Sequence, residues 1–154
     1  MTERHPTPEA IRTVAGRLSR IEGITIDMSV SRIWEHPCGT TACHGGAYLL
    51  ICTKELNISP FIYSQTDAAT TAPYVRGGGM MARHLGFKRC AELTMWADRN
   101  PELWGNIHGM HMFDNAGTPF GVRYPTLHDI CEHWLAVAAR IEKMNDEKAL
   151  AKSA

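Results

Sequence analysis

The chain has 154 residues, which is long enough for one domain with a hydrophobic core of its own. Its apolar fraction of 44% and charged fraction of 21% are those of an ordinary globular protein and exclude a disordered chain. Sixteen basic residues balance sixteen acidic ones, so the formal net charge is zero. This balance argues against a nucleic-acid partner, because domains that bind nucleic acid usually carry a basic stripe.

No apolar run approaches the roughly 18 residues of a membrane-spanning helix, and the first residues do not form a secretory signal. We therefore expect a cytoplasmic protein without a membrane partner. The chain has five cysteines, an odd number. In the cytoplasm they favour burial, metal binding or reactivity over a framework of disulfides.

Helical patterns dominate the chain from its start. Thr7 is suited to cap a first helix over roughly residues 8 to 22, in which apolar residues recur at helical spacing until Gly23. Apolar residues then alternate from Ile24 as in a short strand, and a single turn carrying Ile33 and Trp34 is expected after it.

Residue patterns in the middle of the chain predict three more helices. Thr40 or Thr41 caps the first, which ends near residues 56–57, and a connection over 57–79 follows. Two shorter helices are expected over 80–85 and about 89–98.

The final third holds a predicted hairpin and the last helix. Two apolar segments around a turn-rich Asp-Asn-Ala-Gly predict a small β-hairpin within 108–124. The pattern Thr126-x-x-Asp129 is a capping box that opens the last helix. The tail is expected to fray from about residue 146.

Together these patterns predict a mainly α fold, a single compact domain over residues 1–154 with about five helices and the small hairpin. The expected core includes Ile11, Leu18, Cys43, Ala47, Leu50, Trp96, Trp134 and Ile141.

The residues best suited to metal binding or covalent chemistry lie within 36–46. This stretch contains two cysteines, two histidines and three glycines. One interpretation is structural: Cys43 is a buried apolar residue on the helix and the glycines allow close packing. A second is a metal site. His36, Cys38, Cys43 and His44 are the ligand types that suit tetrahedral zinc, and a distant ligand such as His108, His111, Cys131 or His133 would complete the set.

Two further interpretations involve covalent chemistry. Cys38 precedes the predicted helix start, where the helix dipole would lower a thiol pKa and a nearby histidine would serve as base. Cys38-x4-Cys43-His44 also matches a lengthened form of the covalent haem attachment pattern, with Met110, His111 or Met112 as the opposite ligand. These interpretations stay open beside the structural one.

The segment Cys38-Gly-Thr-Thr-Ala-Cys43-x-x-Gly46, with the later Leu85-Gly86-Phe87, resembles a group of small, uncharacterised bacterial and phage proteins. The resemblance implies a mostly helical protein of a phage or mobile-element setting and brings no activity with it. We therefore expect a non-enzymatic accessory protein that binds a protein partner, such as a host defence or regulatory protein, through residues 57–79 and 99–125. The alternative is a metal- or haem-binding protein centred on Cys38, Cys43 and His44.

Overall fold

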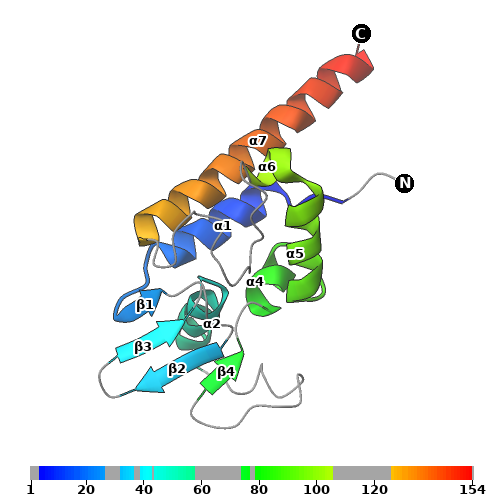
Figure 1. Cartoon of the computed structure of the whole chain (residues 1–154). Coiled ribbons are helices and arrows are strands. Elements are labelled where there is room, and N and C mark those ends of the chain that lie inside the picture. The colour runs from blue at the N-terminus through cyan, green and yellow to red at the C-terminus, as the bar shows by residue number, and fades with distance from the viewer. Residues whose placement is uncertain are drawn as a thin grey trace.

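The computed structural model describes residues 4–26, 32–36, 39–42, 44–57, 74–76, 79–105 and 126–153 (Figure 1). For residues 25, 32–36, 39–42, 44, 74–76 and 90 within these ranges, the backbone alone is described. Six helices account for most of this part of the chain, and a four-stranded sheet packs at one end. The prediction of a mainly α fold is confirmed.

Helices α1 (Pro8–Leu18) and α7 (Leu127–Ser153) lie antiparallel along one another and form one side of the molecule (Figure 1). Their predicted starts are confirmed. The Ala10 amide donates to Thr7 Oγ1 at 3.2 Å, and the Asp129 amide donates to Thr126 Oγ1 at 3.1 Å. Each bond satisfies an amide that the first turn of a helix leaves without an internal acceptor.

The sheet contains β1 (Ile24–Ile26), β2 (Arg32–His36), β3 (Gly39–Ala42) and β4 (Tyr74–Arg76), in the order β1-β3-β2-β4. β1 pairs with β3 in parallel, while β2 pairs antiparallel with β3 and with β4. The strand predicted at Ile24 is confirmed. The predicted turn at Ile33 and Trp34 is wrong, because both residues lie in β2.

Helix α2 (His44–Glu55) contacts strands β1, β2 and β3 and also α1, so it joins the sheet to the helical part. The predicted cap at Thr40 or Thr41 is wrong, because both threonines lie in β3 and the helix begins at His44. Thr40 faces Ile24 of β1, and Thr41 faces Trp34 of β2. Pairing on both sides of β3 therefore outweighs the capping tendency of its threonines.

Helices α4 (Gly79–His84), α5 (Cys90–Arg99) and α6 (Pro101–Trp104) follow one another from α2 back to α7. Contacts between successive helices of this series complete the hydrophobic core. Of the predicted core residues, six are buried and Leu50 is partly buried; Cys43 lies outside the described residues. The six are Ile11, Leu18, Ala47, Trp96, Trp134 and Ile141.

Other predicted elements lie outside the described residues or have different bounds in the structure. The hairpin expected within 108–124 lies outside the described residues, and β4 lies inside the connection predicted over 57–79. α7 continues to Ser153, past the expected start of fraying at about residue 146. Its last turns are rich in Lys, Glu and Ala, which are strong helix formers. None of the helices in the described ranges is both long enough and apolar enough to cross a membrane.

Candidate functional site

The cysteine stretch spans a hairpin and the start of a helix. His36 ends β2 and faces Gly39 in the β2–β3 register, and residues 37–38 connect the two strands. Residue 43 separates β3 from α2, whose first residue is His44. The side chains of His36, Cys38, Cys43 and His44 lie outside the described part of the chain, so the zinc and haem predictions stay predictions.

The strand between the two cysteines changes one premise of the zinc and haem predictions and one premise of the reactive-thiol interpretation. The four residues of β3 span about 10 Å, at about 3.3 Å per residue. A metal ion shared by Cys38 and Cys43 therefore requires the chain to turn back at both ends of β3. The start of α2 follows position 43 and not position 38, so the thiol-activation argument from the helix dipole applies to Cys43 rather than to Cys38.

Two of the suggested distant ligands lie on α7 and contact other groups. The Cys131 thiol donates to the Ala15 carbonyl at 3.5 Å, and burial raises its pKa. The His133 ring packs edge-on against Trp104, with 4.2 Å between ring centroids. Within the described residues there is no group of three or more His, Cys, Asp and Glu side chains that could hold a metal ion.

A polar cluster joins α1, α2 and α4 where these helices meet. Arg17 of α1 donates from Nη1 to the Tyr48 hydroxyl of α2 at 2.9 Å. The same nitrogen lies 3.3 Å from His84 Nδ1 of α4, which also hydrogen-bonds with the Tyr48 hydroxyl. Glu55 holds the other edge of the guanidinium, at 3.5 Å from Arg17 Nε, and also pairs with Arg20 at 3.4 Å.

The electrostatics of this cluster favour neutral Tyr48 and neutral His84. Burial raises the pKa of Tyr48 well above its usual value, so the hydroxyl keeps its proton and can donate it to His84. Burial, together with the positive charge of Arg17, lowers the pKa of His84. When Tyr48 donates to Nδ1, the single ring proton of neutral His84 is on Nε2. Because Tyr48 keeps its proton, it cannot readily act as a base. The cluster is therefore suited to a structural role, in which its hydrogen bonds hold the three helices together.

This cluster was not predicted from the sequence. Its members are 31 and 36 residues apart along the chain, and nothing local links them. The one available signal is Tyr48 itself, a hydroxyl-bearing residue inside the apolar run 47–52. A buried tyrosine hydroxyl usually finds a hydrogen-bond partner, but the sequence does not identify that partner.

We expect Arg17→Gln to raise the pKa of His84, because the substitution removes the positive charge that disfavours its protonation. An NMR titration of the histidine ring protons measures this change. Arg12→Gln is the matched control, since Arg12 is on the same helix but pairs with Glu142 at 3.0 Å. A His84 pKa that moves equally in both variants, or in neither, would show that Arg17 does not act on the ring.

A groove of about 400 Å³ lies where the N-terminal segment before α1 crosses α7. Its apolar lining comes from Pro6, Pro8 and Ile141, and its carboxylates are Glu9, Glu142 and Asp146. His5, on the same segment, accepts a hydrogen bond from Trp96 Nε1 at 3.0 Å. This hydrogen bond holds the N-terminal segment against α5. The wall of the groove that this segment forms therefore has a fixed position.

Beyond the groove, α7 continues past the rest of the molecule (Figure 1). Met144 is the last residue of α7 packed against the core, and residues 145–153 are exposed. Leu150 in this segment is 70% exposed, the highest value among the large apolar residues of the described ranges. The exposed end of α7 and the groove form one continuous surface, because Asn145 and Asp146 belong to both.

No protein-family model, no curated protein and no solved structure matches the chain.

Proposed function

We propose that the protein is a non-enzymatic accessory protein that acts by binding a protein partner at the exposed end of α7 and the adjoining groove. The observation that supports this proposal is the helical segment 145–153, which continues α7 beyond the core and whose residues are all exposed. Isolated helices of this length are marginal in water, so a helix end that leaves the body is suited to pack against another molecule. The resemblance of the cysteine motif supports a phage or mobile-element setting.

The groove favours a basic partner. Glu142 is paired with Arg12, but Glu9 and Asp146 make no ion pair with any residue in the described ranges. Two carboxylates beside prolines and Ile141 suit a Lys or Arg side chain, whose alkyl stem covers apolar surface while its charge meets the carboxylates. We therefore propose a partner segment that brings such side chains into the groove while it lies along the end of α7.

A photo-crosslinking amino acid at position 150, followed by mass spectrometry of the products formed in the cell, tests this proposal. We expect one discrete protein to be labelled. The same group at position 56 is the matched control, because Leu56 is also strongly exposed, at 60%, but lies at the end of α2. Equal labelling from both positions, or labelling of nucleic acid instead of protein, would contradict the proposal.

Charge reversal tests the groove separately. We expect Glu9→Lys combined with Asp146→Lys to reduce crosslinking from position 150 about tenfold or more, because like charges disfavour a basic partner. Glu102→Lys, at an exposed position on α6, should leave the yield unchanged.

Deletion of residues 146–154 should leave the fold intact, which tests separately whether this segment belongs to the fold. Residues 146–153 are all exposed, so we expect the free energy of unfolding to change by less than about 1 kcal/mol. Urea denaturation measures this difference. A loss of several kcal/mol would assign the end of α7 to the fold rather than to a partner surface.

A further inference from the structure

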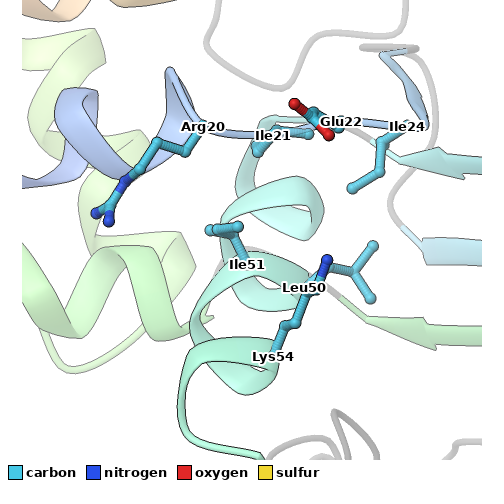
Figure 2. Close-up of a pocket in the computed structure, with 7 residues that line it drawn as sticks. All are labelled: Arg20, Ile21, Glu22, Ile24, Leu50, Ile51 and Lys54. Carbon is cyan, nitrogen blue, oxygen red and sulfur yellow. The ribbon is translucent and has the colours of Figure 1, made fainter.

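A second pocket lies at the other end of α1, between the connection from α1 to β1 and the outer face of α2 (Figure 2). Its volume is about 100 Å³. Four branched aliphatic side chains line it: Ile21, Ile24, Leu50 and Ile51. Ile21 is buried, while the other three are only partly buried, so the pocket exposes apolar surface that the core does not cover.

The volume of the pocket limits the size of the alkyl group that its apolar residues can bind. Cavities of about 150 Å³ lined by aliphatic and aromatic side chains accept a guest as large as benzene. About 100 Å³ therefore suits a branched alkyl group of roughly four carbons. Figure 2 shows Ile21 and Ile51 facing one another across the pocket, with Ile24 and Leu50 on its other side.

The rim carries one available charge of each sign. Lys54 extends along α2 so that its ammonium ends beside Leu50 (Figure 2). Glu22 lies on the opposite wall. Neither Lys54 nor Glu22 forms an ion pair with any residue in the described ranges. Arg20, the third charged residue, is already engaged, because it pairs with Glu55 at 3.4 Å and donates to the Gly16 carbonyl at 3.3 Å.

The wall that carries Glu22 is fixed by the backbone. Gly23 has a φ of +71°, a left-handed conformation that residues with a side chain rarely adopt. The turn at Gly23 reverses the chain between α1 and β1, and Ile24 is then held by the pairing of β1 with β3. The backbone at this turn therefore places both Glu22 and Ile24 on this wall of the pocket.

We propose that this pocket binds a small zwitterionic amino acid with a branched aliphatic side chain. The side chain lies on Ile21, Ile24, Leu50 and Ile51. The α-carboxylate pairs with Lys54, and the α-ammonium pairs with Glu22. This inference does not depend on the proposed function, since the pocket and the groove are at opposite ends of α1.

Chemical-shift perturbation in NMR spectra, recorded with four related compounds, tests the assignment of each contact. L-leucine should bind with a Kd of about 1 mM, as expected for nine heavy atoms of modest efficiency. Glycine lacks the alkyl group, 4-methylpentanoate lacks the ammonium, and 3-methylbutylamine lacks the carboxylate. Each should bind about tenfold more weakly than leucine, and the shifts should centre on residues 20–24 and 50–54.

Two variants separate the charged contacts. Lys54→Gln should weaken leucine and 4-methylpentanoate about tenfold each, whereas Glu22→Gln should weaken leucine and leave 4-methylpentanoate unchanged. Lys148→Gln on the exposed end of α7 is the matched control and should alter neither. Binding of glycine as tight as that of leucine, no binding up to 50 mM, which is about 50 times the expected Kd, or equal effects of the three variants would overturn the proposal.

Discussion

Replacement of Trp134 by alanine is expected to lower the free energy of unfolding by about 3–5 kcal/mol. Trp134 is fully buried on α7 and packs edge-on against Trp104 of α6, with 5.1 Å between ring centroids. The substitution removes the contacts of a whole indole ring and leaves a cavity that the surrounding helices can fill only in part. Since a domain of this size has a total stability of about 5–15 kcal/mol, the loss is a large part of it.

Leu135→Ala is the matched control, because Leu135 is the next residue on the same helix and is 46% exposed. We expect it to cost less than about 1 kcal/mol. Urea denaturation followed by circular dichroism gives both values. If Trp134→Ala does not fold, Trp134→Phe provides a smaller truncation whose cost should still exceed that of Leu135→Ala. Equal costs would mean that α7 does not pack on the core through Trp134.

The helices were predictable from the sequence because their signals are local. The α1 cap needs only Thr7 and the three residues after it, and the α7 capping box lies within Thr126–Asp129. The apolar stripe of α7 also placed Trp134 and Ile141 correctly in the core, because a period of 3.6 residues identifies one helix face. These predictions required no knowledge of what the helix packs against.

The sheet was not predictable in the same way, because its strands are defined by distant pairing. β2 pairs with β4, about forty residues further along the chain, and Trp34 faces Tyr74 across that pair. β3 contains Gly39, Thr40 and Thr41, a combination that local rules assign to a loop and a helix cap. A short strand between two others gains its stability from both neighbours, and single-sequence rules do not measure that contribution.

The candidate sites show the same limit. The stretch 36–46 was conspicuous because its cysteines and histidines are close in sequence. The pocket at Lys54 and Glu22 brings together two segments that are individually unremarkable, and only the packing of the α1–β1 turn on α2 makes them neighbours. The groove at Glu9 and Asp146 likewise depends on the antiparallel packing of α1 and α7.

His133 is expected to make the folded state sensitive to acid. Burial, together with the nearby positive charge of Arg140, lowers the pKa of His133 to about 4. In the unfolded chain a histidine has a pKa of about 6.5, so below that pH the unfolded state takes up a proton that the folded state does not. The contribution of neutral His133 to the free energy of unfolding is therefore fully present above about pH 6.5, and it is lost as the pH falls toward 4. The difference between the two pKa values corresponds to about 3 kcal/mol.

His133→Phe should remove this contribution while it keeps an aromatic ring against Trp104. We expect the unfolding free energy of the variant to fall less steeply between pH 6.5 and 4 than that of the natural protein, by about 3 kcal/mol over the range. Urea denaturation at half-unit pH steps measures both curves. His128→Gln is the control on the same helix; its ring is exposed and pairs with Glu132 at 3.2 Å. Parallel curves for the natural protein and His133→Phe would show that His133 is protonated equally in the folded and unfolded states, and a curve altered by His128→Gln instead would place the acid sensitivity on the surface of α7.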